Sequence, residues 1–110
     1  MMFEKPSMRL YTANSPNGHK ITVTLEELGL PFEAIEVNLP KIEQKEPWFL
    51  AINPNGRIPA LCDIMPDGTP INLFESGSIQ QYLIDRYDTE HKISYPRGTI
   101  EFYQTNNWVR

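Results

Sequence analysis

Three short polar segments of this chain hold side chains that could do chemistry, and the first is ANSPNG at residues 13–18. Within it, Ser15 and Asn17 stand just ahead of an expected helix. A hydroxyl, a side-chain amide and free backbone N–H groups at a helix amino terminus favour a negative group, including a thiolate. The segment therefore predicts an anion or thiolate site, and the alternative is that Ser15 or Asn17 only caps the helix.

The second segment is the pair Glu75-Ser76, at the amino end of another expected helix. Backbone N–H groups and the Ser76 hydroxyl suit a carboxylate, while the Glu75 carboxylate suits an ammonium group beside it. Together these groups suit the head group of a free amino acid. The alternative is a helix cap with nothing bound, although a capping box has its acidic residue after the serine and here Glu75 comes before it.

The third segment is Ile58-Pro59, at the start of an expected strand within residues 51–63. Proline lacks a backbone donor and is confined to edges, bulges and strand starts, so the N–H and C=O groups of Ile58 stay available to an extended peptide. The alternative is an ordinary proline that opens a strand. A ligand with a free amino acid at one end, a peptide backbone in the middle and a thiol would engage all three segments, and glutathione has this structure.

The elements that must position these segments begin with a short β-favouring run at residues 8–12. Apolar residues with helical spacing follow from residue 19 onward and precede Gly29, which suits a helix end. Alternating apolar residues at 35–39 predict a second strand. This order of strand, helix and strand predicts two parallel strands with a right-handed crossover.

The middle of the chain predicts a short irregular helix and then two strands, at residues 41–52, 60–62 and 71–74. The turn between these two strands is short, so they are expected to be antiparallel neighbours. The helix that follows has apolar side chains at helical spacing, with Ser76 or Ser78 as its expected cap. The sequence thus predicts an α/β fold of order βαβαββα with a four-stranded mixed sheet.

The residues after position 90 differ from this pattern. A polar stretch with proline and glycine is typical of a linker, and the apolar spacing of residues 99–110 is typical of another helix. We therefore expect a domain at residues 1–90 and, at residues 91–110, a linker with the first helix of a further segment. Apolar surface should be exposed on the Ile79 helix and around Trp108.

The composition excludes several classes of protein. At 110 residues and a net charge of −4, the chain lacks the basic surface that nucleic acid needs. Neither a membrane span nor a secretory signal is evident, so we expect a cytoplasmic protein with no membrane partner. The single cysteine, Cys62, allows no internal disulfide or metal cluster, so we expect no metal and a thiol that comes with the ligand, with Cys62 serving in packing.

The order of elements and four motifs resemble the thioredoxin-like amino-terminal domain of cytosolic glutathione transferases. The motifs are SPNGHK (15–20), LEELG (25–29), EPWFLAINPNGRIPAL (46–61) and LFESGSI (73–79). They are most similar to the nu-class bacterial enzymes and to the fungal transferases related to the yeast nitrogen-catabolite regulator. The resemblance covers almost the whole chain and implies a thioredoxin-like domain followed by the start of an all-α carboxyl-terminal domain.

The resemblance also implies binding roles for individual residues. It implies a cis peptide bond before Pro59, with the backbone of Ile58 paired to the cysteinyl part of glutathione. Glu75 and Ser76 match the residues that hold the γ-glutamyl head group.

At the other end of the ligand, Gln44 matches a position that reaches the glycyl carboxylate, and Arg57 is a weaker candidate for the same group. Asn17 and Ser15 match residues near the sulfur and are the candidate catalytic residues. They are neutral donors where other transferase classes have a Tyr, a catalytic Ser or a Cys, and Ser15 stands where related proteins often have Thr. Which of the two matters more for activation is open.

The function that this resemblance implies is glutathione transfer. The glutathione thiolate would be conjugated to electrophiles, as in detoxification, or would reduce disulfides and peroxides. The full-length protein would be a homodimer, and these 110 residues alone would be inactive because the apolar substrate pocket of the family comes from the helical domain.

Two alternatives stay open at this point. The first is a regulator that binds glutathione or a protein without catalysis. The yeast regulator has a long Asn-rich arm before its transferase-like part, whereas seven residues precede Met8 here, which favours an enzyme. The second is a structural module with a vestigial ligand site.

Overall fold

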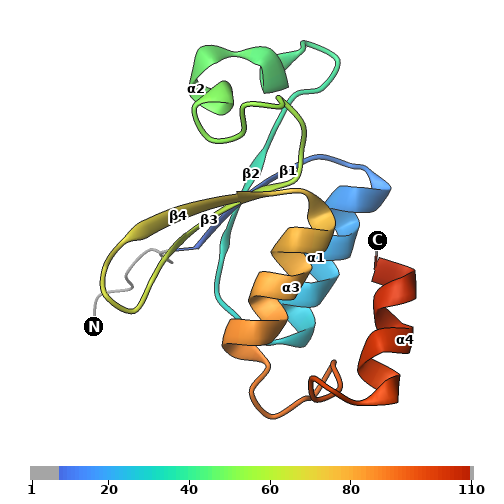
Figure 1. Ribbon diagram of the computed structural model, residues 1–110. Helices are drawn as coiled ribbons and strands as arrows, with labels where there is room; N and C mark the ends of the chain where they lie inside the picture. The colour runs from blue at the N-terminus through green and yellow to red at the C-terminus, as the bar shows by residue number, and fades with distance from the viewer. Residues whose placement is uncertain (1–7, 110) are drawn as a thin grey trace.

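The chain folds into a four-stranded mixed sheet with helices on both of its faces (Figure 1). The computed structural model describes residues 8–109, the last five of them by their backbone, so the surface expected around Trp108 lies outside the described side chains. The elements in chain order are β1 (Arg9–Thr12), α1 (Pro16–Glu27), β2 (Glu33–Glu36), the 3-10 helix η1 (Glu43–Lys45), α2 (Pro47–Leu50), β3 (Ala60–Ile64), β4 (Pro70–Phe74), α3 (Ser76–Tyr87) and α4 (Ile100–Val109).

The strand order in the sheet is β2-β1-β3-β4. β1 and β2 are parallel and are connected through α1, while β1 pairs with β3 and β3 with β4 in antiparallel fashion. The short turn after β3 is closed by the N–H of Gly68, which donates to the Met65 carbonyl at 2.8 Å. This is the βαβαββα order and the mixed sheet that the sequence predicts.

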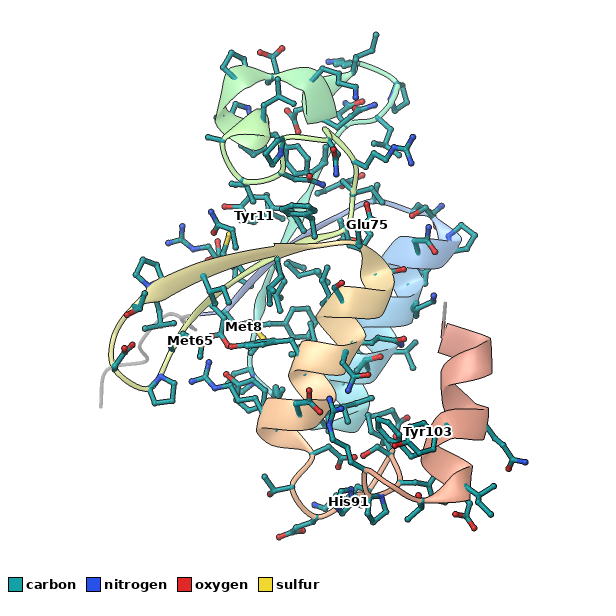
Figure 2. The ribbon with its side chains drawn as sticks, in the orientation of Figure 1. Met8, Tyr11, Met65, Glu75, His91 and Tyr103 are labelled. Carbon is teal, nitrogen blue, oxygen red and sulfur yellow. The ribbon has the colours of Figure 1, made fainter. Side chains whose placement is uncertain are left out.

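Strand residues alternate between two apolar layers, as the pleat of a strand requires. One layer packs the sheet against α1 and α3, and its fully buried members are Leu10, Ile21, Leu25, Leu61, Ile79 and Leu83. On the opposite face, Tyr11 points toward the segment that holds η1 and α2 (Figure 2), where it packs with Val37, Phe49 and Ala60. Both faces of the sheet are therefore covered, one by α1 and α3 and the other by the segment that holds η1 and α2.

α1 begins three residues earlier than the apolar spacing predicts. Ser15 is the N-cap, its hydroxyl accepts the N–H of Gly18 at 3.1 Å, and Pro16 occupies the first helical position, where a missing N–H has no cost. Asn17 therefore lies inside the first turn of α1 and not ahead of it. At the other end, Gly29 has φ +68° and follows the last turn, as expected for a helix end.

Two other expected boundaries are wrong. β2 ends at Glu36 and not at residue 39, because the Asn38 N–H turns away from the ladder and donates to the Glu43 side chain at 3.1 Å. α3 is not capped by Ser76 or Ser78. Ser76 is its first helical residue, and Glu75 occupies the cap position without a side-chain hydrogen bond.

The exposed apolar surface lies elsewhere than expected. Ile79 is fully buried, because α3 turns its apolar side chains toward the sheet, so the expectation for this helix is wrong. Large apolar side chains are exposed instead on α1, at Val23, and on α4, at Ile100 and Tyr103. α4 follows the polar stretch that the sequence predicts as a linker.

Within residues 8–109, no helix has both the length and the apolar character to cross a membrane. The same part of the chain holds no cluster of three or more His, Cys, Asp and Glu side chains arranged to bind a metal ion.

Candidate functional site

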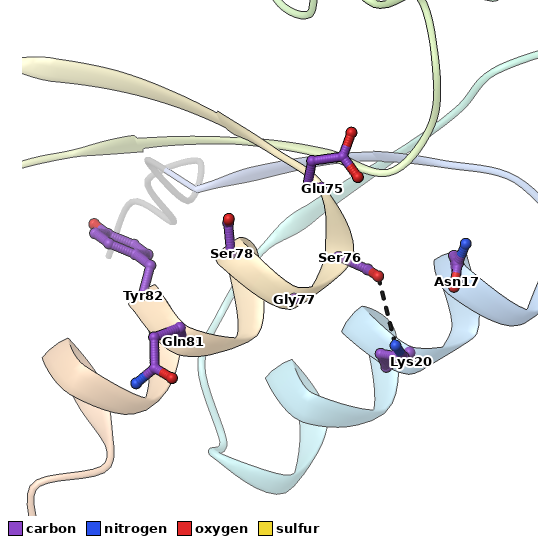
Figure 3. Close-up of a pocket in the computed structure, with 8 residues that line it drawn as sticks. All are labelled: Asn17, Lys20, Glu75, Ser76, Gly77, Ser78, Gln81 and Tyr82. Atoms are coloured by element: carbon purple, nitrogen blue, oxygen red, sulfur yellow. Dashed lines mark hydrogen bonds between the residues drawn. The ribbon is translucent and has the colours of Figure 1, made fainter. Parts of the chain in front are cut away.

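The three polar segments meet where α1 and α3 begin. A groove of about 650 Å³ lies there (Figure 3), lined by Asn17, Lys20, Glu75, Ser76, Gly77, Ser78, Gln81 and Tyr82. A smaller cavity of about 70 Å³ is lined by Asn17, Asn53, Arg57, Ile58, Pro59, Glu75 and Ser76. Since Asn17, Glu75 and Ser76 line both cavities, the groove and the smaller cavity adjoin and form one site.

Within ANSPNG the two candidate catalytic residues have different positions. The Ser15 oxygen accepts the hydrogen bond that caps α1, and Ser15 lines neither cavity. Asn17 is exposed in the first turn of the helix and lines both. The capping alternative therefore describes Ser15, and Asn17 is the residue whose side chain borders the open space. A hydroxyl that accepts one hydrogen bond still has its own proton to donate.

Gly18 brings the start of α1 close to the end of β1. A Cβ atom at this position would lie 2.4 Å from the Thr12 hydroxyl oxygen and 2.5 Å from the Ala13 carbonyl oxygen. Both distances are far shorter than van der Waals contact, so only glycine fits here. A glycine near the start of a helix is unfavourable for the helix itself, and this is the signal in the sequence that could have identified the close approach.

The loop before β3 holds Ile58 and Pro59 in the smaller cavity, and the peptide bond between them is cis, as the resemblance implies. The buried side chain of Asn53 fixes this loop. Its Nδ2 donates to the Arg57 carbonyl at 2.8 Å, and its Oδ1 accepts the N–H of Asn55 at 3.0 Å. The sequence pattern gives no sign of this role for Asn53, because the partners of its amide depend on how the loop closes.

Glu75 and Ser76 join β4 to α3 in an unusual conformation. Glu75 has φ 71° and ψ 118°, and its exposed side chain makes no cap hydrogen bond. Ser76 Oγ accepts a hydrogen bond of 3.5 Å from Lys20 Nζ, which reaches across from α1 (Figure 3). A hydroxyl, an ammonium, a carboxylate and the amino terminus of a helix thus converge on the groove, and this set can bind a zwitterionic head group.

The two residues expected at the glycyl end are placed differently from each other. Arg57 is exposed and lines the smaller cavity. Gln44 lies in η1 and lines neither cavity, and its buried Oε1 finds no hydrogen-bond partner among the described residues. A buried amide oxygen without a partner is costly, so the Gln44 side chain could accept a hydrogen bond from a ligand.

Cys62 lies in β3, outside both cavities, and is half-buried. Burial raises the pKa of its thiol, although the charge of Arg9 acts in the opposite direction. A thiol with a raised pKa is a poor nucleophile at neutral pH. Any thiolate at this site would therefore belong to a ligand.

A thioredoxin-like domain whose cis-proline loop adjoins the amino terminus of α3 is the class that the fold and site define. The family model described as the glutathione S-transferase N-terminal domain matches residues 14–86. The chain therefore belongs to the glutathione S-transferase N-terminal domain family.

Solved and curated relatives agree with this assignment. A crystal structure of a glutathione transferase homologue from Lodderomyces elongisporus, with two GSH per subunit, superposes with a TM-score of 0.89 at 49% identity, over 96% of this chain and 49% of that one. The disulfide-bond oxidoreductase YfcG of Escherichia coli is 51% identical over 79 residues, 70% of this chain and 37% of its own length. Protein URE2 of Meyerozyma guilliermondii is 39% identical over 98 residues, 87% of this chain and 32% of its own length. The chain thus spans less than half the length of these relatives.

Proposed function

We propose that this chain is the glutathione-binding part of a glutathione transferase and that it stabilises the thiolate of bound glutathione. The observation that carries the proposal is the junction of the two cavities, where Asn17, Glu75 and Ser76 form a common wall beside Ile58 and Pro59. The bound glutathione of the Lodderomyces elongisporus relative supports it.

In this proposal each part of the tripeptide has its own partners. The γ-glutamyl head group binds at the start of α3, with its carboxylate at the Ser76 hydroxyl and its ammonium near Glu75. The backbone of Ile58, which lines the smaller cavity, pairs with the cysteinyl residue as an added strand would. Gln44 then reaches the glycyl end, where its Nε2 donates to the carboxylate and its unpartnered Oε1 accepts the glycyl N–H.

The glycyl carboxylate has a second candidate partner in Arg57, which lines the smaller cavity and is exposed. An exposed guanidinium attracts a carboxylate but is screened by solvent and salt. We therefore assign Arg57 a smaller contribution to affinity than the half-buried Gln44 and Ser76.

Asn17 is the proposed catalytic residue, because its amide borders the cavity that holds the cysteinyl position. A cysteine thiol has a pKa of about 8.5, and lowering it by about 1.5 units corresponds to about 2 kcal/mol. A hydrogen bond from Asn17 to the thiolate, together with the amino terminus of α1, is sufficient for this shift. Ser15 has a supporting role, because its side chain caps the first turn of α1 and its hydroxyl proton can donate a second hydrogen bond.

The thiolate then has two possible reactions. In conjugation, its electron pair forms an S–C bond with an electrophile, the leaving group departs with its own electron pair, and the thiol proton has gone to solvent. In disulfide reduction, the thiolate attacks one sulfur and expels the other as a thiolate, which takes a proton from solvent, and the thiolate of a second glutathione attacks the mixed disulfide. Two glutathiones are oxidised to their disulfide while the substrate disulfide is reduced to two thiols. The similarity to a disulfide-bond oxidoreductase favours reduction.

The rest of the proposal concerns the whole protein. We propose residues 1–90 as the glutathione-binding domain and residues 91–110 as the linker and first helix of a second, helical domain that completes the substrate pocket. The matched residues make up 49% and 37% of the length of two relatives, and this supports a second domain. The whole protein would act in the cytoplasm as a homodimer.

A regulator that binds glutathione without catalysis is the second candidate, and the similarity to Protein URE2 is the observation that favours it. The two candidates differ in a measurable property of the bound ligand. An enzyme lowers the pKa of the glutathione thiol, whereas a regulator has no need to do so.

The test of the proposal is the ionisation of bound glutathione, followed by the ultraviolet absorbance of the thiolate as the pH is raised. We expect the chain to lower the thiol pKa and Asn17→Ala to raise it again by about one unit, because a hydrogen bond to a charged group is lost. Calorimetry should show glutathione affinity changed less than about threefold, since one exposed contact of many is removed.

Asn17→Asp is the matched variant, because it has the same shape and a negative charge that repels the thiolate. It should raise the thiol pKa further than Asn17→Ala does. Ser15→Thr should leave the thiol pKa unchanged, since it keeps the hydroxyl and the cap. An unaltered thiol pKa in both Asn17 variants would overturn the catalytic assignment and leave the regulator as the better candidate.

A further inference from the structure

Lys20 is a charged residue of the groove for which neither the motifs nor the comparisons supply a role. It lies in α1, three residues after Asn17 and on the same side of the helix. Its Nζ lies 3.5 Å from Ser76 Oγ, at the start of α3, and Figure 3 marks this contact with a dashed line across the space between the two helices. Lys20 is half-buried, so its charge is partly shielded from solvent.

The charges of the groove suit an α-amino acid head group. Of the side chains that line it, Lys20 is the cation and Glu75 the carboxylate, and the others are neutral. Ser76 lies between Lys20 and Glu75 (Figure 3) and is the first residue of α3. Glu75, at the cap position of α3, makes no side-chain cap hydrogen bond. A carboxylate at Ser76 would therefore meet a hydroxyl, a helix amino terminus and an ammonium together.

The alternative role for Lys20 is to connect α1 to α3, but the two helices have other connections. Gln80 Nε2 donates to Thr24 Oγ1 at 2.9 Å, and the buried side chains of Ile21 and Ile79 belong to one apolar core. A donor-acceptor distance of 3.5 Å is beyond the usual length of such a bond, so the contact with Ser76 contributes little to packing.

We propose that Lys20 is a specificity-determining residue that binds the α-carboxylate of the γ-glutamyl head group. This inference rests on the proposed glutathione site, and it adds a cation to the neutral donors at Ser76. It assigns Lys20 to recognition of the ligand's charge and not to the chemistry at sulfur. Lys20 recognises a free α-carboxylate, which glutathione has and which peptides with a neutral or blocked head group lack.

The experiment measures the affinity of the chain for two ligands by calorimetry. One is glutathione, and the other is the analogue in which the α-carboxylate of the γ-glutamyl residue is replaced by a carboxamide. Lys20→Met should weaken glutathione binding on the order of tenfold, because a bond between two charged groups is lost. It should leave binding of the carboxamide analogue unchanged, since the carboxamide has no negative charge where Lys20 is proposed to bind. Lys20→Arg should keep most of the glutathione affinity.

Lys92→Met is the matched control for net charge, because Lys92 is exposed and lies outside the groove. Equal losses for both ligands in Lys20→Met would show a structural role and overturn the inference, and so would an unchanged affinity for glutathione. If the unaltered chain fails to bind glutathione at millimolar concentration, the proposed function falls and this inference with it. If the unaltered chain binds both ligands equally well, the inference alone falls.

Discussion

Glu75 has a backbone conformation that residues other than glycine rarely adopt. Its φ of 71° lies in the positive region, and it joins β4 directly to α3 beside the groove. Such conformations cost about 1–3 kcal/mol and persist where the surrounding structure requires them, often at functional sites. The carboxylate of Glu75 contributes no cap to α3, so the strained position is better explained by a ligand role than by helix capping.

A stability measurement on Glu75→Gly tests this interpretation. Glycine relieves the strain but increases the entropy of the unfolded chain by about 0.5–1 kcal/mol, so the free energy of unfolding should be unchanged or slightly higher. Glutathione affinity should fall on the order of tenfold, because the partner of the ligand ammonium is removed. Thermal denaturation and calorimetry measure the two quantities.

Glu75→Gln separates the two effects, because it keeps the side-chain length and the strain while removing the charge. Its stability should equal that of the parent chain, with affinity reduced as in the glycine variant. A glycine variant that loses stability and keeps its affinity would contradict a ligand role for Glu75.

At the scale of elements, one buried carboxylate connects β3 to α3. Asp63 accepts hydrogen bonds from the hydroxyls of Tyr82 and Tyr87, each at 2.6 Å, and pairs with Arg86 at 2.9 Å. The Asp63 side chain is 2% exposed. Burial, followed by the hydrogen bond to Asp63, raises the pKa of both phenols, so they stay protonated and act as donors. The cluster sets the position of α3, whose amino end carries Ser76.

Replacing Asp63 with alanine should therefore be strongly destabilising. The change leaves Arg86 and two hydroxyls without their acceptor, and removing one partner of a buried pair costs about 3 kcal/mol or more. Chemical denaturation followed by circular dichroism measures the loss. Asp67→Ala, in the exposed turn after β3, is the control and should cost less than about 1 kcal/mol. Similar losses in the two variants would show that Asp63 contributes no more than a surface residue.

At the scale of the molecule, the segment between α3 and α4 is anchored to α3. The buried carboxylate of Asp88 accepts hydrogen bonds from the N–H of Lys92 at 2.8 Å and the N–H of Ile93 at 3.1 Å, and from the Ser94 hydroxyl. Arg97 pairs with Asp85 of α3 at 2.7 Å. The polar stretch predicted as a linker is therefore held against the domain, and it sets where α4 begins.

The Asp88 anchor should weaken in acid. Burial would raise the pKa of the Asp88 carboxyl, but hydrogen bonds from Ser94, Ile93 and Lys92 outweigh it and lower the pKa below the ordinary value. The stabilisation is therefore complete above the unfolded pKa of about 3.9 and is lost as the pH falls through the lower folded pKa. Amide hydrogen exchange at Lys92 and Ile93, measured by nuclear magnetic resonance, should lose its protection below about pH 4.

Asp88→Asn is the matched variant for this anchor, because it keeps an acceptor oxygen but has no charge to titrate. Its Lys92 and Ile93 amides should be less protected at neutral pH, and their protection should show no loss near pH 4. A loss of protection in the variant at the same pH as in the parent chain would assign the transition to another group.

Local sequence features were sufficient for the order of the elements and for three parts of the site. Apolar spacing predicts α1 and α3, alternation predicts the strands, and turn residues predict the junctions, because each depends on neighbours within a few positions. Asn17, the Glu75-Ser76 pair and the Ile58-Pro59 segment were identified as candidates in the same way, since each has an unusual residue type at the boundary of an element, whereas the cis bond was implied by the family resemblance.

Contacts between distant residues could be decided only by the tertiary structure. Lys20 and Ser76 are 56 positions apart, and no pattern in either segment predicts that one reaches the other. The roles of Ser15 as cap and Asn17 as cavity wall depend on α1 beginning at Pro16, where a close approach to β1 requires Gly18. Local propensities thus determined which elements form, whereas packing determined which side chains share the groove, because contact across a fold depends on the three-dimensional path of the chain.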